Sequence, residues 1–233
     1  MADRTTAGTE LLSFTVVVKK PDVPKTRPGV ELIDHRRQVL ESAKKYARRH
    51  LPEMRSVPLY GDDSNLGYYY VYISMAGSKN KFSVILDTGS GLTVVPCDLC
   101  VGCGTHMGNK YLGGGTATPC GAPCVATQGS CSASVCRFSI SYSEGSKLSG
   151  KFVTDKVCLG AWDKCAESDK VPFSFGCATS MTNLFRTQLA DGIMGVNNNE
   201  HTTLLDSLRA HHDLPEDIFS ICLGIEGGEF VVG

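Results

Sequence analysis

The chain has 233 residues, of which 42% are hydrophobic and 20% are charged, a composition that suits a folded body with a sizeable core. Its formal net charge of −1 argues against nucleic acid as the main partner, because binding to phosphates calls for an excess of Lys and Arg. No run approaches the roughly 18–20 consecutive apolar residues that a membrane-spanning helix needs.

Charge divides the chain into a basic leader, residues 1–59, and an acidic body, residues 60–233. Up to residue 60 there are 12 Lys and Arg against 7 Asp and Glu, whereas the rest carries 11 against 17. Such a leader is either a prosegment held on the body by charge or a solvated tail. Apolar residues at helical spacing predict a helix over Glu31–Leu51.

The cysteines indicate an oxidising compartment. All 11 lie between Cys97 and Cys222, and their odd number leaves one thiol free or paired with something outside the chain. The apolar stretch Leu11–Val18 is too short and interrupted for a good secretory signal. We therefore expect either an incomplete N-terminus or a targeting signal of another kind.

From Tyr60 onwards the sequence predicts an all-β body. Short aromatic and β-branched runs such as Tyr68–Met75 and Lys81–Leu86 are separated by glycines. Thr203–His211 has the best helical pattern in this part, with leucines on one side and a Thr as cap. His212, which follows it, is expected at the surface. The body should therefore hold one or two short helices.

A strand of buried-type residues ends in a carboxylate at Asp87. The strand Phe82–Leu86 leads into Asp87, Thr88, Gly89 and Ser90. Burying an ionised Asp is costly, but Gly89 allows a tight turn and the two hydroxyls can orient the carboxylate. Alone, an Asp-Thr-Gly triplet is a weak signal, since an Asp-Gly turn after a strand has the same form.

Four later segments strengthen the signal. Phe138–Ser146 predicts a β-hairpin with a glycine near its tip, and Ala190–Gly195 places an apolar pair between glycines. Asp217–Leu223 and Gly227–Gly233 predict two closing strands.

This order of motifs resembles the pepsin-like aspartic proteases, from about Tyr60 to the end of the chain. The resemblance implies the N-terminal lobe of that family, with closed or orthogonal, barrel-like β-sheets behind a helical prosegment. It implies that Asp87 is the catalytic aspartate of this lobe, that Thr88 lies at the lobe junction, and that Ser90 hydrogen-bonds the carboxylate. Gly89 completes the active-site turn.

The same resemblance makes Tyr142 the flap tyrosine that closes over substrate. It makes Ile193–Gly195 the segment that wraps the active-site loop. Val94 stands where the family usually has a Trp that pairs with the flap tyrosine, so the usual flap geometry is not expected here.

A narrower resemblance is to the cysteine-rich export proteases of the plasmepsin V type, whose insert is related to that of plant nepenthesins. It rests on a Cys-rich insert over residues 97–136, on the flap sequence Tyr142–Ser146 and on Phe175–Cys177. Those enzymes work in the secretory pathway of parasites and cut exported polypeptides after an Arg-x-Leu motif.

The narrower resemblance implies specific roles in the flap. Glu144 would contact a substrate Arg, with help from Gln188, while Gly145 and Ser146 complete the flap tip. Ser143 departs from the group, which has a cysteine there. The resemblance also implies location in the endoplasmic reticulum or Golgi, with a possible membrane anchor in a region absent from this sequence.

The first cysteines of the insert have a rival interpretation. Cys97, Cys100 and Cys103 followed by His106 are compatible with a zinc or iron–sulfur site. However, a second Cys-x2-Cys at finger spacing is absent, and the next four cysteines stand at irregular intervals. Disulfides suit this pattern better, and we expect neither a metal nor another cofactor.

Aspartic protease chemistry needs two carboxylates that share one proton, so that one acts as base and the other as acid. This sequence has one Asp-Thr-Gly and no second Asp-Thr-Gly or Asp-Ser-Gly. We favour a fragment of a two-lobe endopeptidase whose C-terminal lobe supplies the second aspartate. The alternatives are a lobe that dimerises, with Asp87 from each copy, and a non-catalytic lobe that binds peptides or a protease.

Overall fold

The computed structural model describes residues 55–233 except 63–64, 79, 127–128, 198–202, 213–217 and 226. The helix expected over Glu31–Leu51 lies outside the described residues, as does nearly all of the leader. The first described strand, β1 (Arg55–Asp62), crosses the boundary drawn at Tyr60, and its first residues already pair with the end of the chain.

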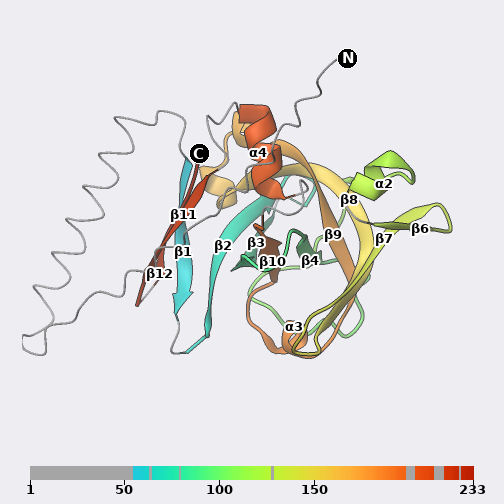
Figure 1. Ribbon diagram of the computed structural model, residues 1–233, viewed down its shortest axis with the longest axis horizontal. Coiled ribbons are helices and arrows are strands. Elements are labelled where there is room, and N and C mark those ends of the chain that lie inside the picture. Colours follow the sequence, from blue (N-terminus) through green and yellow to red (C-terminus); the bar gives the residue numbers. More distant parts are fainter. Residues whose placement is uncertain are drawn as a thin grey trace, which may run out of the picture.

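The body is all-β, as predicted, and its described strands join in one hydrogen-bonded sheet (Figure 1). Six strands form a closed ring in the order β2, β3, β10, β4, β9 and β8, because β8 also pairs with β2. The ring strands are β2 (Tyr68–Met75), β3 (Asn80–Asp87), β4 (Thr93–Pro96), β8 (Lys147–Leu159), β9 (Val171–Met181) and β10 (Gly192–Gly195). The expected barrel-like closure is therefore confirmed.

The remaining strands extend the sheet on both sides of the ring. On one side β1 continues into the two closing strands β12 (Gly227–Val232) and β11 (Phe219–Gly224). On the other side lie β7 (Val135–Ser141) and β6 (Ser130–Ser132), while the short β5 (Thr116–Ala117) pairs with β8.

Short helices lie around the barrel in Figure 1. The helices are α2 (Ala122–Ala126), α3 (Leu184–Thr187) and α4 (Leu204–His212), with two 3-10 turns, η1 (Trp162–Lys164) and η2 (Glu167–Asp169). The helix predicted at Thr203–His211 is thus present, and the Thr203 hydroxyl accepts a hydrogen bond from Asp206 N at 3.2 Å. None of the helices within the described ranges is long and apolar enough to cross a membrane.

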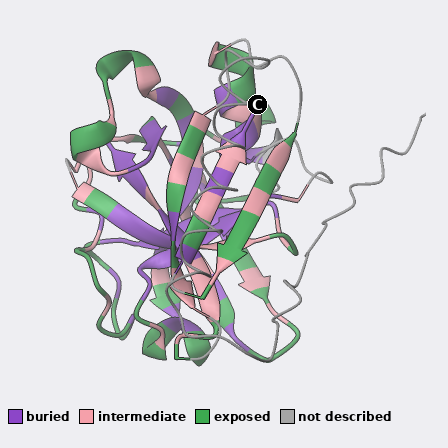
Figure 2. Ribbon diagram, turned by 90° about the vertical axis from the view of Figure 1, so that its left-hand side faces the viewer, coloured by how far each residue is buried: buried purple, intermediate pink, exposed green. Residues whose placement is uncertain are grey.

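The core divides into two clusters of apolar side chains. In Figure 2 the buried parts of the chain run through the centre of the body. The larger lies inside the barrel, where α4 contributes three leucines; its largest side chains include Phe82, Phe175, Met194 and Phe230. The smaller lies under the hairpin of β7 and β8; it includes Val94, Phe138, Phe152 and Phe185. Burial of these side chains is the main stabilising contribution.

Ten of the eleven cysteines form disulfides, as the sequence predicts, and all eleven lie among the described residues. Cys222 is the exposed free thiol. The pairs are Cys97–Cys177, Cys100–Cys103, Cys120–Cys131, Cys124–Cys136 and Cys158–Cys165.

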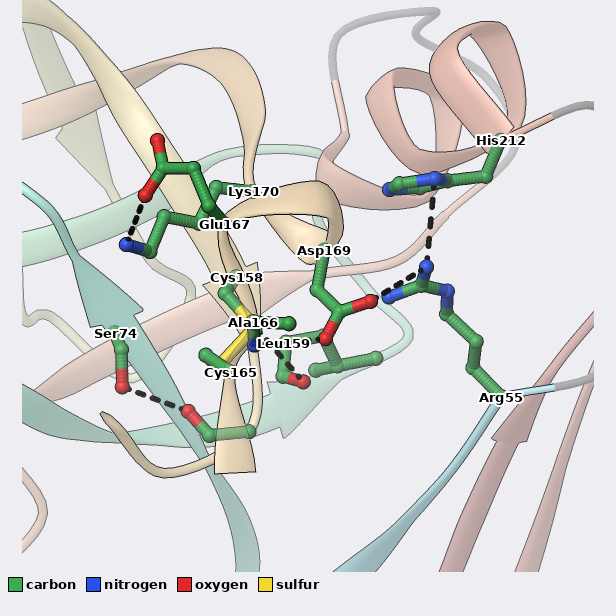
Figure 3. The surroundings of a disulfide bond; sticks show 11 residues. Arg55, Ser74, Cys158, Leu159, Cys165, Ala166, Glu167, Asp169, Lys170 and His212 are labelled. Atoms are coloured by element: carbon green, nitrogen blue, oxygen red, sulfur yellow. Dashed lines mark hydrogen bonds and ion pairs between the residues drawn. A yellow bond between two sulfur atoms is a disulfide. The ribbon is translucent and has the colours of Figure 1, made fainter. Parts of the chain in front are cut away.

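The Cys158–Cys165 disulfide lies beside an ionic cluster that ties three elements together (Figure 3). Arg55 at the start of β1 is 3.1 Å from the Asp169 carboxylate and 3.4 Å from Nδ1 of His212. Burial and the charge of Arg55 lower the pKa of His212. His212 is therefore half-buried rather than at the surface as expected, whereas its neighbour His211 is exposed.

Candidate active site

Asp87 ends β3, and its carboxylate is held by the turn that follows. Oδ1 accepts a hydrogen bond from the Gly89 N–H at 2.9 Å, and Oδ2 accepts one from the Ser90 hydroxyl at 2.5 Å. The two donors hold both carboxylate oxygens and so fix the plane of the carboxylate. Thr88 is exposed and makes no hydrogen bond through its side chain to another described residue.

The turn after Asp87 is locked in place by β10, which lies between β3 and β4. Gly195 is in register with Asp87, and Val196 N donates to the Asp87 carbonyl at 2.9 Å. A Cβ at Gly192 or Gly195 would collide with neighbouring backbone, at Val94 and Ser90 respectively. The glycines that flank the apolar pair are therefore required by close backbone packing.

The β7–β8 hairpin carries the predicted flap. Tyr142 N donates to the Ser146 carbonyl at 2.9 Å and Gly145 N donates to the Tyr142 carbonyl at 3.0 Å, which closes the turn. Gly145 has φ of 93°, a conformation that favours glycine. This part of the chain therefore forms the hairpin that the sequence predicts.

The tip of the flap is tied to the start of α3. Asn183 Nδ2 donates to the Gly145 carbonyl at 2.9 Å, and Leu184 N donates to the Ser146 hydroxyl oxygen at 3.2 Å. These bonds come from a segment that the sequence analysis did not single out. They place Ser146 as an anchor of the flap, buried beneath its tip.

Tyr142 packs against an aromatic partner that the sequence did not reveal. Its ring lies 5.1 Å from that of Phe185, in the same cluster as Val94. Burial raises the pKa of Tyr142 to about 12, and the Asp87 and Glu144 carboxylates add to the rise while Ser90 opposes it. The tyrosine hydroxyl thus lies within electrostatic reach of Asp87 and stays protonated at any physiological pH.

The two predicted specificity residues are not in contact with each other. Glu144 is exposed at the flap tip. The Gln188 side chain donates to the Ala190 carbonyl at 3.2 Å, and it makes no hydrogen bond to Glu144 or Asp87 within the described ranges. Glu144 is therefore available to a ligand, while Gln188 is engaged with its own segment.

Asp191 is a second aspartate of importance that the sequence analysis passed over. The residue is 1% exposed, and its carboxylate accepts hydrogen bonds from the Ser83 N–H and hydroxyl and from Gly108 N, each at 2.7 Å. These contacts join β10 to β3 and to the insert. The sequence did carry a signal for this role, the Asp191-Gly192 pair just before the apolar residues Ile193 and Met194. A carboxylate next to a buried strand needs hydrogen-bond donors from the surrounding protein.

The insert cysteines are used in disulfides, and the two ring nitrogens of His106 both face carbonyl oxygens. Among the described residues no group of three or more His, Cys, Asp or Glu is placed to hold a metal ion. The disulfide interpretation of the insert is therefore the one that the structure supports.

Comparison with known proteins agrees with this geometry. Residues 69–233 match the family described as xylanase inhibitor N-terminal. The chain is 33% identical to aspartic protease 5 of Toxoplasma gondii, over 93% of this chain and 23% of that protein. It is 32% identical to plasmepsin V of Plasmodium falciparum, over 75% of this chain and 31% of that protein.

A plant relative gives a similar match. Identity to aspartyl protease family protein 1 of Arabidopsis thaliana is 28%, over 77% of this chain and 39% of that protein. The chain thus spans well under half the length of these relatives. Together with the barrel and the Asp87 loop, these matches show that the chain belongs to the pepsin-like aspartic protease family.

Proposed function

We propose that this lobe supplies one half of the active site of an aspartic endopeptidase. The observation that carries the proposal is the Asp87 carboxylate, which is fixed by Gly89 and Ser90 and lies within electrostatic reach of the flap tyrosine. A carboxylate held in this way, next to the β7–β8 hairpin, suits a water molecule bound between protein and peptide.

The reaction requires a second carboxyl group. One ionised carboxylate takes a proton from water as the water oxygen bonds to the scissile carbonyl carbon, while the other carboxyl protonates the carbonyl oxygen. The C–N bond then breaks as its nitrogen takes up a proton. Asp191 is not the second group, because it is buried and its oxygens are engaged with Ser83 and Gly108.

The second carboxylate therefore comes from a further lobe or from a second copy of this lobe. We expect a statine-type transition-state analogue such as pepstatin to bind only assemblies that hold two such carboxylates. Size-exclusion chromatography of the chain, with and without the analogue, measures this. Stable analogue binding by a monomer of this chain would contradict the need for a partner.

The rival function is a non-catalytic lobe that binds peptides or a protease. The matched family carries an inhibitor in its description, so membership alone does not decide between hydrolysis and binding. The rate of peptide hydrolysis by an Asp87→Asn variant separates the two functions.

We propose further that Glu144 recognises an Arg in the substrate, as in an Arg-x-Leu motif. Glu144→Gln should lower kcat/KM for an Arg-containing peptide by roughly 10- to 100-fold, the size of one charge-assisted hydrogen bond. Steady-state kinetics on paired peptides, with Arg or Gln at that position, provides the measurement.

Glu229 offers a matched control for this substitution. It lies on β12, where its carboxylate accepts from Ser56, and Glu229→Gln should leave both peptides unaffected. An equal loss by Glu144→Gln on the Arg and the Gln peptide would show that the residue does not read this charge.

The basic leader and the disulfides suggest two further parts of the proposed function, a prosegment and a cellular location. We propose that the basic leader, residues 1–59, acts as a prosegment drawn to the acidic body by charge. We also propose that the protein works in the secretory pathway, in the endoplasmic reticulum or Golgi. The five disulfides support an oxidising compartment.

A further inference from the structure

The flap turn and the start of α3 lie side by side, and each binds the backbone of the other through a side chain (Figure 1). Asn183 Nδ2 donates to the Gly145 carbonyl at 2.9 Å, and Leu184 N donates to the Ser146 hydroxyl oxygen at 3.2 Å. We call this the flap–α3 contact and define it as residues 145–147 against residues 182–184.

Asn183 does not do what its place in the helix leads one to expect. It is the N-cap residue of α3, a position at which the Asn side chain usually accepts a hydrogen bond from the first turn of its own helix. The Asn183 side chain makes no such capping bond. Ser146 accepts from the first N–H of α3 instead, and the Asn183 amide is directed to the flap.

The backbone of Asn183 is strained in this arrangement. Its φ of 49° and ψ of −122° lie in a region that glycine adopts readily and other residues adopt rarely. Such a conformation persists only where neighbouring contacts hold it. On the other side of Asn183, Thr182 N donates to the Lys147 carbonyl at 3.0 Å, and Lys147 N donates to the Thr182 hydroxyl oxygen at 2.8 Å. Contacts with the flap therefore flank the strained residue.

The same contact holds the backbone next to Glu144. Gly145 N donates to the Tyr142 carbonyl at 3.0 Å, and the Gly145 carbonyl accepts from Asn183. Both backbone polar groups of Gly145 are thus engaged, and Glu144 directly precedes it. Because Glu144 is exposed at the tip, the backbone beneath it determines where its carboxylate points.

We propose that Asn183 is a positioning residue of the flap, which holds Gly145, and with it Glu144, in place through a hydrogen bond while its own backbone is strained. When the flap lifts from α3, the bond is lost and the backbone relaxes. The two contributions oppose each other, so the closed and the lifted flap lie close in free energy. A substrate contact at Glu144 then shifts the flap towards the closed state. This last step rests on the proposed function, whereas the hydrogen bond and the strain do not.

The strain is tested by comparing Asn183→Ala with Asn183→Gly in the complete chain. Both variants lose the side-chain hydrogen bond, but only glycine adopts this backbone without strain. The thermal midpoint of the glycine variant should therefore exceed that of the alanine variant by roughly 2–6 °C. An ordinary side-chain contact gives the opposite order, because glycine gains more freedom in the unfolded chain.

Asn109 provides the matched control for this comparison. It is exposed in the insert and has no positive φ, so its glycine variant should be no more stable than its alanine variant. Equal midpoints for the two Asn183 variants, or a lower one for Asn183→Gly, would overturn the strain.

Hydrogen exchange measured by NMR tests the hold on the flap. The amides of Leu184 and Lys147 donate across the flap–α3 contact, so they exchange when it opens. In Asn183→Ala both should exchange roughly 3- to 10-fold faster than in wild type, and in Asn183→Gly their rates should return towards wild type. The Met107 amide, which donates to the Leu189 carbonyl beyond α3, should stay within about 2-fold. Unchanged rates in Asn183→Ala, or the same increase at Met107, would overturn the positioning role.

Steady-state kinetics of the enzyme assembled with its partner tests the link to Glu144. Asn183→Ala should lower kcat/KM roughly 3- to 10-fold for the Arg peptide, mainly through KM, and less than about 2-fold for the Gln peptide. Equal losses on both peptides would show that Asn183 does not position Glu144. If the exchange rates change as expected and wild type cleaves neither peptide, the proposed function fails while the role of Asn183 in holding the flap stands.

Discussion

Asp87→Asn is expected to abolish peptide hydrolysis by the complete enzyme, with a loss in kcat of at least about 10²- to 10⁴-fold. The amide keeps the size of the carboxylate and an oxygen that can still accept from Gly89 N. It cannot carry the negative charge that takes a proton from water or share a proton with the second carboxylate. The fold should be retained, because the changed side chain is half-buried and lies at the end of β3.

The measurement is hydrolysis of a peptide substrate by wild type and variant, each assembled with its partner lobe or as a dimer. Asp98→Asn is the matched control: Asp98 is exposed in the insert and also accepts from a backbone N–H, that of Leu99 at 2.8 Å. It should retain wild-type activity. Retention of activity by Asp87→Asn would instead favour the non-catalytic lobe.

Asp191→Asn should cause the largest loss of stability among single conservative changes at the site. The Asp191 carboxylate receives three donors in a buried position, and an amide must turn N–H groups toward at least one of them. Hydrogen bonds to a charged group contribute about 1.5–3 kcal/mol each, so we expect the free energy of unfolding to fall by about 3 kcal/mol or more. That corresponds to a thermal midpoint lowered by roughly 6–12 °C.

Thermal or denaturant unfolding of the complete chain measures this effect. Asp163→Asn serves as control, because the Asp163 carboxylate is exposed and its ion pair with Lys164, at 3.8 Å, contributes little. A loss of less than about 1 kcal/mol for Asp191→Asn would mean that the donors of Ser83 and Gly108 find other acceptors.

The sequence predicted the parts of the site whose signals are local. The strand before Asp87, the turn with Gly89 and Ser90, and the flap hairpin depend on residues that are close in the chain, so spacing and turn chemistry reveal them. The helix at α4 was likewise found from its leucines, which are buried as expected.

Contacts between residues far apart in the sequence could not be predicted from it. Cys97 pairs with Cys177, 80 residues away, and spacing alone does not select that partner among eleven cysteines. His212 contacts Arg55, which lies 157 residues away in the sequence. Phe185 and Asn183 meet the flap through a short helix that has too few residues for a periodic pattern.

The longest strand, β8, links the flap to the barrel, and its pairing with β9 shifts register between Ser149 and Gly150. At Gly150 the strand passes so close to the Cys177 carbonyl that no side chain would fit. Because Cys177 is bonded to Cys97, the first cysteine of the insert, this disulfide also supports the part of β8 from which the flap extends. Reduction of the Cys97–Cys177 disulfide would therefore loosen the part of the sheet that supports the flap. This holds although residue 143 in the flap itself is a serine, which offers no thiol to modify.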